Sequence, residues 1–178
     1  LLILADMWTV DKRYLNANHF VTQREFNSQY KLRPADNAIL TDKDPNYRVL
    51  DLSVDVFNDS HTSYFHKTIG GYSAAKLQRY QDMIDYFIIP EIQNLGNALK
   101  QSPTLSSIEG SLSQQKALNM LNAKYIIIDP NSAPINNRFV YGNAWFVKDY
   151  ELVDSPDDEI ITLKQIDPKE SAVINKEF

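Results

Sequence analysis

Residues Gln114–Pro130, QQKALNMLNAKYIIIDP, join a helical pattern directly to a strand pattern. The segment up to Leu121 carries apolar side chains at helical spacing, whereas Lys124–Asp129 is rich in β-branched isoleucine and is followed by Pro130. Only two residues separate the two patterns. Such a short connection is typical of layered folds in which helices pack on a sheet. The segment therefore predicts a domain of the α/β (α+β) class.

A second strand and a long helix precede this segment. Arg48–Val56, RVLDLSVDV, alternates apolar with polar residues and predicts a strand with one buried face. Ser73–Ile89 has helical periodicity; we expect Pro90 to interrupt the helix, which could resume over Glu91–Leu99. We therefore expect a single soluble domain over residues 1–178, in which a mixed β-sheet contains both strands and helices pack on it.

The rest of the chain gives weaker local signals. Pro34 at a first helical position predicts a short helix, and residues 100–110, which contain Ser, Pro and Gly, predict an exposed linker within the domain. The segment IITLKQI, residues 160–166, fits a helix or a strand. The other expected pieces are an irregular segment Tyr14–Lys31, a loop Phe57–Ile69, short strands Ala144–Val147 and Tyr150–Val153, and a final strand through Ala172–Ile174.

Composition narrows the possible functions. The apolar fraction of 43% in 178 residues is enough for a real core. The net charge of −5 argues against a nucleic-acid partner, because phosphate binding needs a basic surface. The absence of cysteine excludes disulfides, thiolate catalysis and cysteine zinc sites. We predict no cofactor.

The first residues are strongly apolar. Leu1–Trp8, LLILADMW, has Asp6 as its only charge and a tryptophan at its edge. Residues 1–10 fit the last turns of a preceding membrane helix with an interfacial tryptophan, or equally an ordinary buried element. No stretch of the sequence is apolar enough over a sufficient length to span a bilayer.

His61–Tyr86, HTSYFHKTIGGYSAAKLQRYQDMIDY, concentrates aromatic and cationic residues around a glycine pair. The glycines predict a sharp turn, after which Ser73 can cap a helix. A helix start that carries such side chains favours an anionic ligand such as the phosphate of a glycosyl phosphate. The candidate ligand-binding residues are Tyr64, His66, Lys67, Gly70, Gly71, Tyr72, Lys76, Arg79 and Tyr80.

The plainer interpretation of this stretch stays open. Tyr72 and Tyr80 could be half-buried core residues, and Arg79 could pair with Asp82 or Asp55. If the stretch is a functional site, we expect the glycine pair, Tyr72, Lys76 and Arg79 to form one wall of that site.

Catalytic and metal sites have less support. His61 and His66 are five residues apart, which misses the spacing of a helical metal pair, and structural or surface histidines are the better interpretation. We therefore predict no metal. Asp51 and Asp55, four apart on the predicted strand, could act as an acid and base pair, and Asn143–Trp145 could form a ligand platform, although burial of Trp145 is favoured. No serine-hydrolase, zinc-protease, phosphate-loop or EF-hand motif is present.

Four segments resemble, in order, the extracytoplasmic region of YfhO-type bacterial membrane proteins, most closely those of Bacteroides-like bacteria. The best-marked pattern is Gly71, Tyr72, Arg79 and Tyr80, followed by Asn143, Ala144 and Trp145. The segments are RVLDLSVDVFND (48–59), GGYSAAKLQRYQDMIDY (70–86), ALNMLNAKYIIIDP (117–130) and GNAWFVKDYELV (142–153).

The resemblance implies a polytopic parent protein similar to GT-C glycosyltransferases, which use lipid-phosphate-linked sugars on the outer, periplasmic face of the cytoplasmic membrane. It implies two partners: the membrane portion of the same polypeptide and a lipid-phosphate-linked sugar. GT-C enzymes generally place their catalytic acid in a loop between early membrane helices. This chain contains no such segment, so we expect it to have no turnover alone.

Three functions therefore stay open. The first is an extracytoplasmic domain that assists transfer of a sugar from a lipid-phosphate donor to a cell-envelope glycan. The second is a noncatalytic module that binds a cell-envelope partner or a polysaccharide. The third is a freestanding hydrolase that uses Asp51, Asp55 and the histidines.

Overall fold

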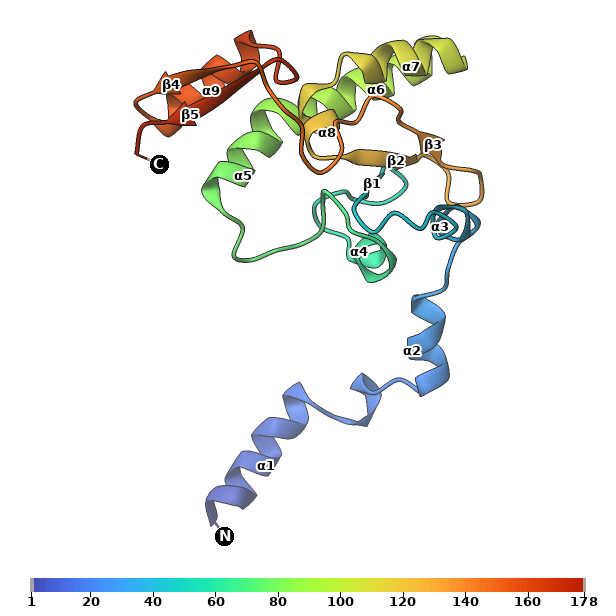
Figure 1. Cartoon of the computed structure of the whole chain (residues 1–178). Helices are drawn as coiled ribbons and strands as arrows, with labels where there is room; N and C mark the ends of the chain where they lie inside the picture. Colours follow the sequence, from blue (N-terminus) through green and yellow to red (C-terminus); the bar gives the residue numbers. More distant parts are fainter. Residues whose placement is uncertain (1, 178) are drawn as a thin grey trace. The chain divides into compact units, whose positions relative to one another are not determined.

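The computed structural model describes residues 2–177 (Figure 1), and the chain divides into two compact units, residues 1–32 and 33–178. The first unit contains α1 (Leu2–Tyr14), a 3₁₀ turn (Ala17–His19) and α2 (Gln23–Gln29). The prediction of an irregular Tyr14–Lys31 segment was therefore wrong. Local capping explains the difference at α2, because Thr22 and Glu25 form a capping box there.

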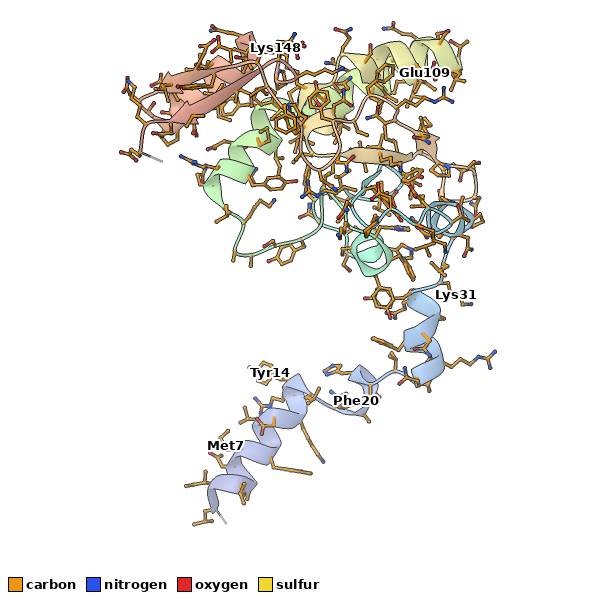
Figure 2. All side chains as sticks on the ribbon, viewed as in Figure 1. Met7, Tyr14, Phe20, Lys31, Glu109 and Lys148 are labelled. Atoms are coloured by element: carbon orange, nitrogen blue, oxygen red, sulfur yellow. The ribbon has the colours of Figure 1, made fainter. Side chains whose placement is uncertain are left out.

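The helices of the first unit bury none of their described side chains. Figure 2 shows the side chains of α1, Met7 and Tyr14 among them, projecting away from the ribbon. Leu2 and Trp8 are 88% and 64% exposed. None of the helices within residues 2–177 has the length and apolar character that a membrane crossing requires.

The second unit is built on a small mixed sheet of β1 (Arg48–Asp51), β2 (Ala123–Ile127) and β3 (Ile135–Asn136). β1 pairs with β2 in parallel and β2 with β3 in antiparallel orientation. Leu50 lies opposite Ile126, and both side chains are completely buried. The mixed sheet with helices packed on it confirms the predicted fold class.

Both strands are shorter than predicted. β1 ends at Asp51 instead of Val56, because the Asp51 carboxylate accepts hydrogen bonds from the backbone N–H and the hydroxyl of Ser53 and bends the chain into a turn. β2 ends at Ile127. The predicted loop after β1 contains a short helix, α4 (His61–Phe65).

Helices surround this sheet. The helix predicted from Ser73 begins instead at Gln78, as α5 (Gln78–Met83), which continues through a π-helical turn (Ile84–Ile88) into α6 (Ile89–Gln101). Pro90 does not interrupt it, because the N–H of Ile89 already bonds in π fashion to Ile84 and the proline falls in the first turn of α6. The remaining helices around the sheet are α3 (Pro34–Ile39), α7 (Leu105–Ser113) and α8 (Lys116–Met120).

Part of the predicted 100–110 linker is helical. α7 begins after Thr104, whose side chain accepts a hydrogen bond from the N–H of Ser107. Ile108 and Leu112 are buried against the core, so this segment contributes to the fold. The helix predicted to begin at Pro34 is confirmed.

The last elements form a βαβ unit of β4 (Asp149–Val153), α9 (Pro156–Gln165) and β5 (Ser171–Asn175). β4 and β5 pair in parallel. Ser155 caps α9, which resolves the IITLKQI segment as a helix. The strands predicted at Tyr150–Val153 and Ala172–Ile174 are confirmed, whereas Ala144–Val147 forms no strand.

One main core joins these layers. Ile160 and Leu163 of α9 pack against it, so the βαβ unit shares the core of the central sheet. In Figure 1 this unit lies beside α5. The core is centred on Leu50, Ile69, Ile84, Ile88, Leu95, Leu112, Leu118 and Ile126.

Candidate functional site

The residues predicted to bind a ligand do not gather in one place. His66 is buried in a polar cluster, Lys67 donates to the Pro45 carbonyl at 2.7 Å, and the Tyr80 hydroxyl donates to the Ile69 carbonyl. Tyr64 and Tyr72 are exposed. Of the residues predicted to form one wall, Gly70, Gly71 and Lys76 line one pocket, whereas Arg79 lines another.

The glycine pair has a packing role. A Cβ on Gly70 would lie 1.8 Å from the Val56 carbonyl oxygen, and Gly71, at φ +94°, donates its N–H to the same oxygen at 2.7 Å. Ser73 caps no helix, since α5 begins only at Gln78. The pair therefore does not present the helix N–H groups that the anion-binding hypothesis required. The glycines help to line a small pocket of about 250 Å³ with Phe57, Ile69, Ser73, Ala75, Lys76, Leu77 and Tyr80.

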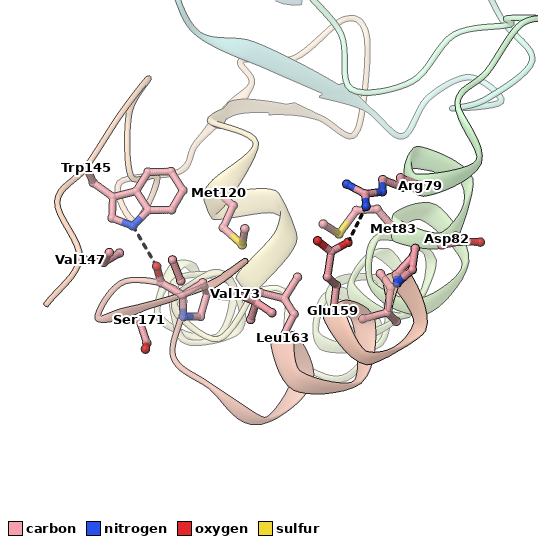
Figure 3. A pocket seen from close by; sticks show the side chains of 14 residues that line it. Arg79, Asp82, Met83, Met120, Trp145, Val147, Glu159, Leu163, Ser171 and Val173 are labelled. Atoms are coloured by element: carbon pink, nitrogen blue, oxygen red, sulfur yellow. Dashed lines mark hydrogen bonds and ion pairs between the residues drawn. The ribbon is translucent and has the colours of Figure 1, made fainter. Parts of the chain in front are cut away.

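Arg79 belongs to a different pocket, which we call the apolar pocket (Figure 3). Its volume is about 320 Å³. The Arg79 Nη2 atom lies 3.4 Å from Glu159 Oε2, an ion pair that the sequence did not indicate. The lining residues come from α5, α8, α9, β5 and nearby loops: Arg79, Asp82, Met83, Met120, Trp145, Val147, Pro156, Glu159, Ile160, Leu163, Pro168, Ser171, Ala172 and Val173.

Trp145 is held in a defined orientation at the edge of this pocket. Its indole Nε1–H donates to the Pro168 carbonyl at 2.9 Å (Figure 3). Its ring meets that of Tyr141 edge to face, with centroids 5.0 Å apart. The side chain is half-buried, so it belongs to a pocket wall and not to the interior of the core.

Trp145 also lines a second cavity of about 390 Å³, which we call the polar pocket. Sequence reasoning singled out only Trp145 there; the aromatic run at 139–146 was the available signal. Burial, together with the charges of Asp167 and Glu91, raises the pKa of Tyr141. The polar pocket is lined by Ser113, Asn119, Arg138, Phe139, Val140, Tyr141, Trp145, Asp167 and Lys169.

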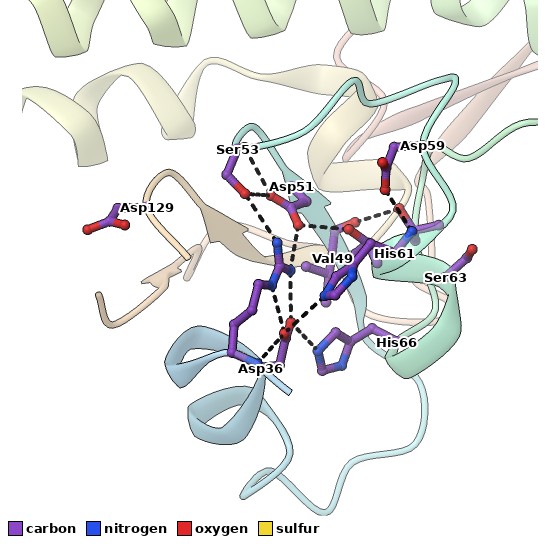
Figure 4. Close-up of polar contacts among 12 residues, drawn as sticks. Asp36, Val49, Asp51, Ser53, Asp59, His61, Ser63, His66 and Asp129 are labelled. Atoms are coloured by element: carbon purple, nitrogen blue, oxygen red, sulfur yellow. Dashed lines mark hydrogen bonds and ion pairs between the residues drawn. The ribbon is translucent and has the colours of Figure 1, made fainter. Parts of the chain in front are cut away.

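A buried ion-pair cluster lies beneath β1 (Figure 4). Arg33 donates to both carboxylate oxygens of Asp36, through Nε at 2.8 Å and Nη2 at 2.9 Å. The same Nη2 donates to Asp51 Oδ2 at 2.7 Å. Thr62 also donates to Asp51, at 2.7 Å, and His66 Nε2 lies 3.1 Å from Asp36 Oδ1. The cluster therefore connects α3, β1 and α4.

The cluster shifts the pKa values of its members. Burial alone would raise the pKa of Asp36, yet the hydrogen bonds and charge of Arg33, with His66, lower it to about 2. Burial would also raise the pKa of Asp51, but the hydrogen bonds from Ser53, Thr62 and Arg33 outweigh burial and lower it. For His66, burial prevails over the attraction of Asp36, and the pKa is lowered. Asp36 and Asp51 are thus ionised at neutral pH and His66 is neutral.

This cluster has a structural role and is not an accessible acid and base pair. Asp36 and Asp51 are 0% and 2% exposed, and the His66 side chain is completely buried. Asp55, the predicted partner of Asp51, lies in an exposed turn, where it accepts from Asn58 and the N–H of Phe57. Within residues 2–177, no group of three or more acidic or histidine side chains is placed to hold a metal ion.

A second buried carboxylate, missed by sequence reasoning, organises α8. Glu91 accepts hydrogen bonds from the N–H groups of Lys116, Ala117 and Leu118 at 2.7–2.9 Å. These N–H groups belong to the first turn of α8, where a carboxylate satisfies them and interacts favourably with the positive end of the helix dipole. Glu91 therefore has a capping role across the α6–α8 contact.

Comparison of the chain with models of protein families, with curated proteins and with solved structures gives no match. The assignment of function therefore depends on the pockets and on the resemblance of the four sequence segments.

Proposed function

We propose that this chain is the extracytoplasmic part of a YfhO-type membrane protein and helps to transfer a sugar from a lipid-phosphate donor to a cell-envelope glycan. It acts on the outer face of the cytoplasmic membrane, beside the membrane portion of the same polypeptide. Its contribution is binding, and not catalysis. The observation that carries this proposal is the apolar pocket, in which the hydrocarbon of the lipid donor binds.

The pocket has the size and lining of a ligand site. About 320 Å³ lies at the lower end of small-molecule pockets, which are mostly apolar with a few polar groups. Met83 and Met120 supply flexible, polarisable side chains that adapt to an irregular chain. Arg79 and Glu159 provide the polar groups.

The exposed apolar side chains of the first unit support the proposal that the chain lies at a membrane. The apolar side chains of α1 are exposed at its amino-terminal end, and Trp8 follows them. Lys12 lies over the Trp8 ring at 5.2 Å, and Arg13 comes next. Apolar residues that lead into a tryptophan are typical of a helix end at the bilayer interface, whereas the two cations taken alone favour the cytoplasmic side, a rule that large translocated domains often do not follow.

The closed ion-pair cluster supports a noncatalytic role. Asp51 and His66, two groups that a hydrolase would need, are buried and hydrogen-bonded within the cluster. A general base must reach its substrate proton within hydrogen-bond distance. The described residues offer no such base in the cluster, which favours a binding function over a freestanding hydrolase.

Binding of farnesol and farnesyl phosphate to the purified chain tests the proposal. Ala172→Leu adds volume inside the apolar pocket and is expected to weaken farnesol binding at least about tenfold, or roughly 1.4 kcal/mol. Ile174→Phe adds bulk on the same strand outside the pocket lining and is the matched control. Absence of farnesol binding, or equal binding by both variants with unchanged melting temperatures, would refute the proposed site.

A further inference from the structure

The apolar and polar pockets share a wall. Trp145 lines both, and its hydrogen bond to Pro168 fixes it between them. Asp167 and Lys169, on either side of Pro168, line the polar pocket, whereas Pro168 itself lines the apolar one. The two cavities therefore meet at Trp145, one mostly apolar and the other lined by aromatic and charged side chains.

The polar pocket has the side chains that a phosphorylated sugar requires. Tyr141 and Trp145 provide aromatic faces on which a sugar ring can stack. Arg138 and Lys169 place two cations in this pocket, although the net charge of the chain is −5. The guanidinium of an arginine can bind phosphate through two parallel hydrogen bonds. Asp167 adds an acceptor for sugar hydroxyls.

The loop that carries these groups is held in place by buried amides. Asn137 is completely buried; its side chain donates to Asn119 Oδ1 at 2.8 Å and accepts the N–H of Phe139 at 3.0 Å. The N–H of Tyr141 donates to the Asn119 carbonyl at 3.0 Å. Arg138 and Tyr141 are thus presented from a backbone that is fixed before any ligand binds, which reduces the entropy lost on binding.

We infer that the polar pocket is the subsite for a glycosyl phosphate head group, with Arg138 on the phosphate and Tyr141 and Trp145 on the sugar. The inference rests on the proposed function, because the hydrocarbon of the same ligand occupies the apolar pocket. Trp145 is the boundary between the two parts of the ligand.

Tryptophan fluorescence can test the two pockets separately. The chain has two tryptophans, so Trp8→Phe leaves Trp145 as the only reporter. The probes are glucose 1-phosphate for the head subsite, inorganic phosphate and glucose for its parts, and farnesol for the apolar pocket. We expect glucose 1-phosphate to change the Trp145 emission and to bind more tightly than either phosphate or glucose.

Arg138→Ala is the decisive variant. Loss of a charge-assisted contact is expected to weaken glucose 1-phosphate at least about tenfold, or roughly 1.4 kcal/mol, while farnesol binding is unchanged. Arg24→Ala, which removes an exposed arginine of the first unit, is the matched control and should change neither affinity.

The outcomes separate the two proposals. Farnesol binding without a response to glucose 1-phosphate, or equal affinity in Arg138→Ala, would overturn the head-group subsite and leave the proposed function standing. Arg138-dependent binding of glucose 1-phosphate without farnesol binding would support the subsite and overturn the apolar site. Equal affinities for inorganic phosphate and glucose 1-phosphate would reduce the pocket to an anion site and refute the sugar assignment.

Discussion

Replacement of Arg33 by methionine should lower the free energy of unfolding of the second unit more than a substitution at an exposed position does. Arg33 is the common partner of Asp36 and Asp51, which it reaches at 2.7–2.9 Å. Methionine keeps much of the aliphatic length but leaves two carboxylates without a cation, at exposures of 0% and 2%. Removal of one partner from a buried ion pair typically costs about 3–5 kcal/mol. We expect a loss in this range at pH 7.

The assay is urea unfolding followed by circular dichroism, with the free energy of unfolding extrapolated to water. Arg24→Met, at an exposed position, should change the free energy by less than about 0.5 kcal/mol. Adding Asp36→Asn and Asp51→Asn to Arg33→Met should recover part of the loss, because the unpaired charges are then removed. A loss below about 1 kcal/mol for Arg33→Met, or no recovery in the triple variant, would show that the cluster does not connect α3 to β1 as described.

Three further outcomes follow from buried groups and from the glycines. Stability should fall on acidification in two stages. The first lies below about pH 6.5, because the unfolded chain protonates His66 more readily than the folded one, and His66→Asn should flatten it. The second lies between about pH 4 and 2, where protonation of Asp36, whose pKa is lowered to about 2, removes roughly 2 kcal/mol; urea midpoints from pH 8 to 2 measure both stages. Gly70→Ala should cost at least about 2 kcal/mol, since its Cβ would overlap the Val56 carbonyl, and a variant of wild-type stability would contradict this close approach. Gly96→Ala should instead stabilise by about 0.5–1 kcal/mol in thermal or urea unfolding, because the position is helical and open.

Local sequence patterns predicted the strands and helices that are determined by neighbouring residues. The alternation around Val49 and Leu50 and the isoleucine run through Ile126 predicted the two paired strands, and Pro34 predicted the start of α3. These signals succeed because periodicity and proline geometry act over a few neighbouring residues. The same local logic failed at Ser73, because α5 begins only at Gln78 and the close approach of Gly70 to Val56 joins residues that no local pattern connects.

Composition and short-range spacing are enough to predict the α/β class, the acidic charge and the absence of cysteine chemistry. Which side chains meet became known from the folded chain. It paired Arg33 with Asp51, placed Glu91 at the start of α8, and directed Arg79 away from the glycine pair and toward Glu159. Such contacts join residues tens of positions apart, and their energies appear only when packing has brought the segments together and excluded water from between them.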